Sequence, residues 1–229
     1  MFRNVKHAVR SLSKSPFVTA IAVVSLALGI GANAAIFSLF HQVLLRPLPV
    51  EDPDALVNLS APGVKSGSNS CNNAGDCDVV FSYPMFRDLE EIQTVFTGVA
   101  AHRSFGANLA YGGETSTASG MMVSGSYFPV LGLQAAVGRL IGANDDATAG
   151  ESAVAVLSHS YWQTQFGRDP SILNDTLVVN GQPMAIIGVA PEGFDGTTLG
   201  NRPKVFVPIT MREVVEVRRS GHRENRRSY

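Results

Sequence analysis

A long uncharged apolar run near the N-terminus constrains this chain more than any other feature. From Phe17 to Phe40, about 24 residues pass without a charged side chain, and the apolar character continues to residue 45. The sequence Arg46-Pro47-Leu48-Pro49 then ends the run, because proline lacks a backbone donor and restricts the residue before it. At 1.5 Å per residue, a helix of about 24 residues extends about 36 Å, enough to cross a hydrocarbon core of about 30 Å. The sequence therefore predicts a membrane-spanning helix over residues 17–45.

Charge is distributed unevenly on the two sides of this run. Residues 1–16 contain four basic side chains and no acid, whereas Glu51, Asp52 and Asp54 follow the run. An excess of Lys and Arg marks the cytoplasmic side of a membrane helix. We therefore expect residues 1–16 to be a cytoplasmic basic segment and residues 46–229 to form a domain outside the cytoplasm.

Three other structures compete for the same segment. A basic start, an apolar run and the triplet Ala32-Asn33-Ala34 also fit a signal peptide cleaved after Ala34, although the apolar run continues past that point. The residues from Gly29 to Ala34 match the loose dinucleotide pattern G-x-G-x-x-G/A, but that pattern needs a strand before it and an amphipathic helix after it. A buried helix of a soluble protein would rarely be this long.

Small residues are concentrated in the second half of the predicted helix. Ala27, Gly31 and Ala35 recur at four-residue spacing and share one side of a helix, and Gly29 lies between them in sequence. Small side chains allow two helix backbones to approach closely in a membrane. We therefore expect Ala27, Gly29, Gly31 and Ala35 to pack against another membrane helix.

The remaining composition excludes several classes of partner. The formal net charge is −1, so no overall positive field attracts nucleic acid, and we expect no nucleic-acid partner. Cys71 and Cys77 stand close together in a loop, where they could form a disulfide outside the cytoplasm or remain two reduced thiols. Neither these cysteines nor the scattered histidines have the spacing of metal ligands, so we expect no metal and no cofactor.

From about residue 50 the pattern predicts a mixed α+β domain with a core of its own. The segment 61–79 has the composition of a loop, and Met85 to Phe96 has the spacing of an amphipathic helix. Ser158 is placed to cap a helix that ends near Gly167. The Asn180-Gly181 pair predicts a type I′ hairpin between 176–179 and 184–189. Further strands are expected at 98–110, 116–124, 154–157 and 205–209, and a short helical turn at 127–132.

The sequence contains no convincing catalytic constellation, and we expect no enzymatic activity. His159 lies beside Ser158 and Ser160, but sequence neighbours rarely form a catalytic pair, and we interpret it as a surface histidine. We interpret Asp145 and Asp146 as solvated, and Arg103 and Arg139 as surface charges. The phosphate-binding loop G-x-x-x-x-G-K-[ST] is also missing, so the chain alone is not expected to bind ATP in that manner.

Several segments, taken in order, carry a resemblance to a known family. They are residues 11–49 and the runs FSYPMFRDL (81–89), VSGSYFPVLGLQAAVGRL (123–140), VAVLSHSYWQTQFGRDPSIL (154–173), NGQPMAIIGVAPEGFDG (180–196) and VFVPITM (205–211). Together they resemble the MacB/FtsX-like permeases of ABC transporters, and in particular the permease group abundant in acidobacteria. The first segment resembles the family's first membrane helix, and the others resemble its periplasmic core domain. The resemblance covers nearly the whole chain, although each motif is weak by itself.

The resemblance implies a mechanical role in the inner membrane of a bacterium. It implies a separate ATPase subunit, a second permease unit, contact with membrane lipid, and a periplasmic adaptor, with ATP-driven motion passed to the periplasmic domain for export or efflux. It implies no catalytic residue. The residues that it implies for the domain scaffold are Tyr127, Phe128, Gly138, Arg139, Trp162 and Phe166.

The chain departs from the family pattern in three places. The later membrane helices of such permeases do not follow, so we expect a chain truncated at its C-terminus. Asn174 stands where the family generally has glycine, which leaves the local turn open, and the loop with Cys71 and Cys77 is an elaboration. The alternative to a permease is a secreted or membrane-anchored periplasmic binding or interaction module without transport activity.

Overall fold

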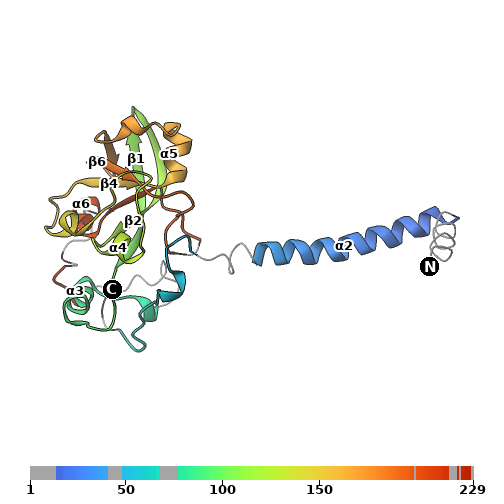
Figure 1. The fold of residues 1–229 in the computed structure, drawn as a ribbon, viewed down its shortest axis with the longest axis horizontal. Coiled ribbons are helices and arrows are strands. Elements are labelled where there is room, and N and C mark those ends of the chain that lie inside the picture. The colour runs from blue at the N-terminus through green and yellow to red at the C-terminus, as the bar shows by residue number, and fades with distance from the viewer. Residues whose placement is uncertain are drawn as a thin grey trace. The chain divides into compact units, whose positions relative to one another are not determined.

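The computed structural model describes residues 14–40, 48–65, 67, 77–198, 200–216, 221 and 223–227. The chain divides into two units, Met1–Pro47 and Leu48–Tyr229, and each is described by itself (Figure 1). The first unit contains the long helix α2. The second contains a seven-stranded sheet and short helices. A mixed helix-and-strand domain that follows a single apolar helix confirms the predicted α+β fold class.

Helix α2, Pro16–Phe40, has 25 residues and no acid in its first turn. Its stretch Pro16–Ser38, with a mean hydropathy of 2.1, is long and apolar enough to cross a membrane. The last part of the predicted span, residues 41–45, lies outside the described residues. At about 100° per residue, Gly31 shares a side of α2 with Ala27 and Ala35, whereas Gly29 lies about 200° around the axis from Gly31. The amide of Asn33 donates to the Gly29 carbonyl at 3.0 Å.

The strands of the second unit form a closed ring. In spatial order the sheet runs β3-β6-β4-β7-β2-β1-β5, and β5 pairs again with β6. Strand β6 therefore has β4 on one edge and, on the other, first β5 and then β3. Closure leaves fewer unpaired strand edges to join a second chain. The strands are β1 His102–Tyr111, β2 Glu114–Val123, β3 Val137–Gly138, β4 Val154–Leu157, β5 Thr176–Val179, β6 Gln182–Val189 and β7 Val205–Pro208.

Two tight glycine turns form the hairpins of this ring. Asn180 and Gly181 have φ of 50° and 82° between β5 and β6, which confirms the type I′ turn predicted from the Asn-Gly pair. Gly112 and Gly113, with φ of 58° and 86°, connect β1 to β2. In both turns the positive φ values match the right-handed twist of the flanking strands.

Strands β4 and β7 and the last four residues of β2, 120–123, are buried on both faces. Successive side chains of a strand point to opposite sides of the sheet, so these strands contribute to two cores. One core lies inside the ring and contains Met122, Leu157 and Val207, together with side chains from β1, β5 and β6. The other lies outside the ring and contains Met121, Val156 and Phe206. The sequences of β4 and β7 and the end of β2 from Met121 to Val123 are therefore continuous apolar runs, although only part of the sheet is parallel.

Short helices cover the sheet. Helix α5, His159–Phe166, is capped by Ser158, whose hydroxyl accepts from the Tyr161 N–H at 3.3 Å, and it ends at Gly167 in the left-handed conformation. That prediction is confirmed. The remaining helices are α3 Tyr83–Ile92, α4 Tyr127–Val130 and α6 Arg212–Val215, and the 3-10 turns are η2 Pro53–Ala55, η4 Cys77–Val79, η5 Ala143–Asp146, η6 Pro170–Ile172 and η7 Ile209–Met211.

The helix predicted from Met85 to Phe96 is shorter than expected. It ends at Ile92, and Gln93 is already extended, with its side chain accepting from the Phe96 N–H at 2.9 Å. The β-branched residues Thr94 and Val95 follow at once, and such residues propagate a helix less well. Of its apolar positions, Phe86 is buried and Ile92 is 71% exposed.

Candidate functional site

An aromatic cluster fixes α4 against the outer face of the sheet. The rings of Tyr127 and Phe128 meet edge to face at 5.2 Å, and Phe128 meets Phe206 at 5.4 Å and Phe194 at 6.3 Å. Phe128 is 1% exposed. Edge-to-face pairs at these distances add to the stability that burial provides. The scaffold role expected for Tyr127 and Phe128 stays a prediction.

The Tyr127 hydroxyl reaches the loop that follows β6. It lies 3.0 Å from the Thr197 hydroxyl, and burial raises the pKa of Tyr127 to about 12. The His102 ring lies 5.6 Å from the Tyr127 ring, and its Nε2 is 3.1 Å from the Thr198 hydroxyl. Desolvation lowers the pKa of His102, although part of the residue remains exposed. The lowered pKa favours the uncharged imidazole.

Gly138 and Arg139 lie where β3 pairs with β6. Gly138 has a φ of 69°, and a Cβ at this position would lie 2.4 Å from the Ile187 carbonyl oxygen, so only glycine fits. Arg139 donates to both carboxylate oxygens of Asp145, at 2.6 and 2.9 Å. Burial raises the pKa of Asp145, but the hydrogen bonds from Arg139 and the Gly142 N–H lower it by a larger amount. The pKa of Asp145 is therefore below its usual value.

The interpretation of Asp145 and Asp146 as solvated is wrong, since they are 6% and 4% exposed. The Asp146 carboxylate accepts from the Gly125 N–H at 3.0 Å and the Thr210 N–H at 3.3 Å. Burial raises its pKa, against the lowering effect of these hydrogen bonds. The two acids are buried because backbone N–H groups and one guanidinium replace water around them.

Trp162 and Phe166 hold α5 in place. The Trp162 indole N–H donates to the Asp169 carbonyl at 2.8 Å, and the Phe166 ring meets the Tyr111 ring at 4.8 Å. His159 is 8% exposed and lies edge to face with Trp162 at 5.5 Å. The prediction of a surface histidine is therefore wrong, because packing against the indole covers the imidazole.

Arg103 is paired rather than a free surface charge. Its guanidinium donates to Glu216 at 2.7 Å, and the same carboxylate lies 3.5 Å from the Arg212 guanidinium. This ion-pair network joins β1 to the segment after α6. It uses the face of β1 that is opposite to Ser104, because neighbouring residues of a strand alternate between faces.

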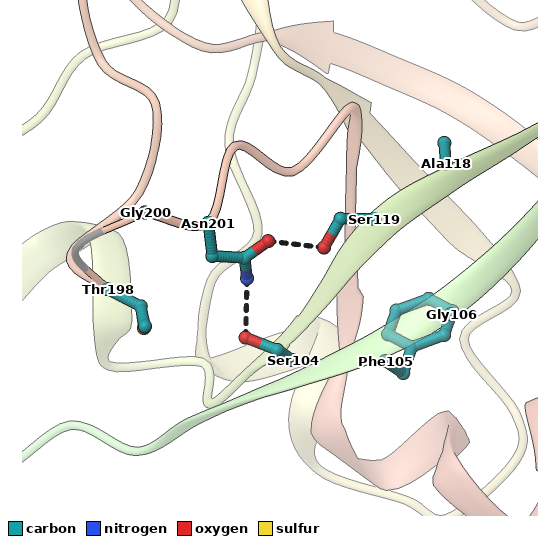
Figure 2. A pocket seen from close by; sticks show the side chains of 8 residues that line it. All are labelled: Ser104, Phe105, Gly106, Ala118, Ser119, Thr198, Gly200 and Asn201. Atoms are coloured by element: carbon teal, nitrogen blue, oxygen red, sulfur yellow. Dashed lines mark hydrogen bonds between the residues drawn. The ribbon is translucent and has the colours of Figure 1, made fainter. Parts of the chain in front are cut away.

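A polar groove lies on the outer face of the β1–β2 hairpin (Figure 2). Its volume is about 440 Å³. The hairpin and the loop before β7 line it with Ser104, Phe105, Gly106, Ala118, Ser119, Thr198, Gly200 and Asn201. We call this the hairpin groove.

Asn201 fixes the loop to the hairpin. Its amide nitrogen donates to the Ser104 hydroxyl at 2.5 Å, and its amide oxygen accepts from the Ser119 hydroxyl. Figure 2 shows the amide between the two serines. This site could not be predicted from the sequence, because Asn201 is 97 residues from Ser104 and 82 from Ser119. The local signal was the glycine-rich run from Gly193 to Gly200, which indicates a loop but not its partners.

Among the described residues, no group of three or more His, Cys, Asp or Glu is placed to hold a metal ion. The His102 imidazole contacts the Thr197 and Thr198 hydroxyls, and in this part of the chain no carboxylate bonds its other nitrogen.

The packing of Ala27, Gly29, Gly31 and Ala35 against another helix stays a prediction. Gly29 and Gly31 leave open space where a side chain would stand. Cys71 lies outside the described residues and Cys77 begins η4, so the disulfide also stays a prediction.

The family model described as MacB-like periplasmic core domain matches residues 19–227. The chain belongs to this family. The match begins within α2 and extends through the closed sheet to the end of the described residues, and it confirms the resemblance found from the sequence segments. The MacB-like core domain thus contains the aromatic cluster, the Arg139–Asp145 pair and the hairpin groove.

Two solved structures are similar to this MacB-like chain. The extracellular domain of the noncanonic ABC-type transporter YknZ from Gram-positive bacteria has 23% identity and a TM-score of 0.49, with 60% of this chain and 67% of that chain covered. The periplasmic region of MacB from Actinobacillus actinomycetemcomitans has 21% identity and a TM-score of 0.49. The match covers 64% of this chain and spans 64% of that MacB region. No curated protein matches the sequence.

Proposed function

We propose that this chain is part of an ABC-type transporter permease, anchored in a bacterial inner membrane by α2 with its N-terminus in the cytoplasm. The observation that supports this most strongly is the family match over residues 19–227, which covers the apolar helix and the closed domain together. The basic side chains of residues 1–16 support the orientation. The domain after α2 would then face the periplasm.

The closed sheet suits a part that transmits motion. Each strand of the ring is paired on both sides over part of its length, and two cores hold both faces of β4, β7 and the end of β2. Packed interiors transmit displacement with little compression. We propose that a separate ATPase drives the membrane part, that a second permease unit completes the assembly, and that the domain moves as one body during export or efflux without catalysing covalent chemistry.

The topology can be tested with single cysteines in a background in which Cys71 and Cys77 are replaced by serine. K14C precedes α2, and V64C lies on a fully exposed residue of the second unit. A membrane-impermeant maleimide should label V64C in intact spheroplasts and K14C only after lysis. The reverse pattern would overturn the orientation, and an intact mass that lacks residues 1–34 would favour a cleaved signal peptide.

The transport role can be tested by hydrolysis of ATP. The chain has no G-x-x-x-x-G-K-[ST] loop, so activity in an assembly purified through a tag on this chain would come from another subunit. We expect vanadate-sensitive hydrolysis that is lost when the ATPase subunit's own Walker lysine is replaced. An assembly that retains the domain and its membrane anchor but hydrolyses no ATP would favour a binding module without transport.

A further inference from the structure

We propose that the hairpin groove binds an uncharged carbohydrate. This inference rests on the groove alone and does not depend on a transport role. The groove's volume of about 440 Å³ falls in the range of small-ligand sites, about 300–1,000 Å³. None of its eight lining residues is ionisable, so it offers no charge to hold a phosphate, a carboxylate or an amine.

The hydrogen-bonding groups in the groove are mixed and partly unused. A hydroxyl has one donor and two acceptor sites, and an amide has two donors and two acceptors. Ser104 accepts from Asn201 and keeps its own O–H, whereas Ser119 donates to Asn201 and keeps its acceptor sites. Asn201 keeps a second N–H. Adjacent sugar hydroxyls, each both donor and acceptor, match this alternation better than an ion or an apolar molecule.

The charges near the groove are directed elsewhere. Arg103 follows the opposite face of β1 and pairs with Glu216, and the Lys204 ammonium lies over the Tyr161 ring at 5.1 Å. Arg202, which follows Asn201 in the loop, is exposed and lies 3.8 Å from the Asp195 carboxylate. His102 lies on the same face as Ser104, and desolvation lowers its pKa, which favours the uncharged imidazole. The surroundings therefore favour a neutral ligand.

Strands β1 and β2 form the floor of the groove, and their pairing does not favour a peptide that joins the sheet as an extra strand. Peptides that join a sheet need a free strand edge. β2 lies between β1 and β7. On the other edge of β1, Leu109 and Ala110 pair with β5, and the Asn180 side chain bonds the Gly106 carbonyl and the Asn108 N–H, so this edge is occupied from Gly106 to Ala110. A ligand is therefore received on the face of the hairpin.

Gly106 allows the groove to be filled without disturbing the fold. A Cβ built at Gly106 meets nothing within 4 Å, and its φ is not in the left-handed region. In G106V the side chain would occupy the groove, while a β-branched residue is favourable in a strand. N108V is the matched control, because Asn108 is exposed on the same face of β1 but does not line the groove.

The experiment uses the full chain in lipid nanodiscs, since maltoside and glucoside detergents carry neutral saccharides as head groups. Saturation-transfer NMR would test cellobiose, maltose and N,N′-diacetylchitobiose against glucuronate, glucosamine and a capped tri-alanine peptide. We expect at least one neutral saccharide to bind with a Kd of about 1 mM, G106V to weaken it at least tenfold with an unchanged or higher Tm, and N108V to bind as the wild type does.

Three results would overturn the inference. One is the lack of transfer to any neutral saccharide at about 10 mM, well above the expected Kd. Another is saccharide binding that G106V retains, which would place the site elsewhere. The third is stronger binding of the peptide or of a charged sugar, which would assign the groove to a different ligand class.

Discussion

Asn180 is expected to secure the place where the ring of strands closes. Strands β1 and β5 pair only at Leu109–Val179 and Ala110–Val178. Asn180 extends this pairing: its N–H donates to the Asn108 carbonyl at 2.9 Å, its side-chain oxygen accepts from the Asn108 N–H at 2.7 Å, and its amide nitrogen donates to the Gly106 carbonyl at 3.0 Å. The side chain thus acts as a short continuation of β5.

Two substitutions separate the contributions of Asn180. N180G keeps the positive φ and loses three side-chain hydrogen bonds, of which the one to the Val215 carbonyl is long at 3.4 Å; each is worth about 0.5–1.5 kcal/mol or less. Because the site is exposed and water can replace them, we expect a loss of about 1–2 kcal/mol. N180A loses the same bonds and adds about 1 kcal/mol for a left-handed residue with a Cβ, so its loss should be about 2–3 kcal/mol.

The assay is urea unfolding of the full chain in nanodiscs, followed by the fluorescence of Trp162, the single tryptophan, together with amide hydrogen exchange at Asn108. N180G should speed exchange at Asn108 by about tenfold, which corresponds to about 1.4 kcal/mol. G181A is the matched control, because it strains a φ of 82° without removing a side-chain bond. Equal stability of N180G and wild type, or unchanged exchange at Asn108, would refute the reasoning.

Three further changes test the scaffold. R139M removes the guanidinium that lowers the pKa of Asp145, and the free energy of unfolding should fall by about 1 kcal/mol at pH 7. Urea titrations should show the difference between wild type and R139M shrinking as the pH falls through the lowered pKa of Asp145. The reason is that protonation of Asp145 removes its ion pair with Arg139 in the wild type. G188A places a Cβ 2.1 Å from the Arg139 carbonyl oxygen, so calorimetry should show a loss of about 3 kcal/mol or more. F128A should cost about 3–5 kcal/mol by urea unfolding, whereas I92A, at a residue 71% exposed, should stay within about 0.5 kcal/mol.

The parts of the fold that the sequence predicted are those with local causes. The β5–β6 hairpin follows from the Asn180-Gly181 pair, and α5 follows from the Ser158 cap and Gly167. Each signal lies within a few residues of the structure that it determines. A single sequence is sufficient there because the chain must satisfy these backbone requirements whatever its tertiary contacts.

The closure of the sheet and the burial of its polar residues depend on contacts distant in sequence. β4 pairs with β6 in parallel and β2 with β7 in parallel, which periodicity cannot indicate. Asp146 is expected on the surface by residue type, but it accepts from Gly125, 21 residues away, and Thr210, 64 residues away. The hairpin groove was missed for the same reason, since its polar wall and floor come from separate segments.

The asparagines on either side of β5 connect the departure from the family pattern to the closure of the ring. Asn174, where glycine was expected from the resemblance, has a φ of 67°, and its N–H donates to the Ile186 carbonyl at 2.8 Å. Asparagine is among the few residues with a Cβ that adopt this conformation readily, so the turn is retained. Asn180 does the same at the other end of β5. A strand of only four residues that must reach both β6 and β1 needs sharp turns at both ends, and an asparagine makes the turn at each.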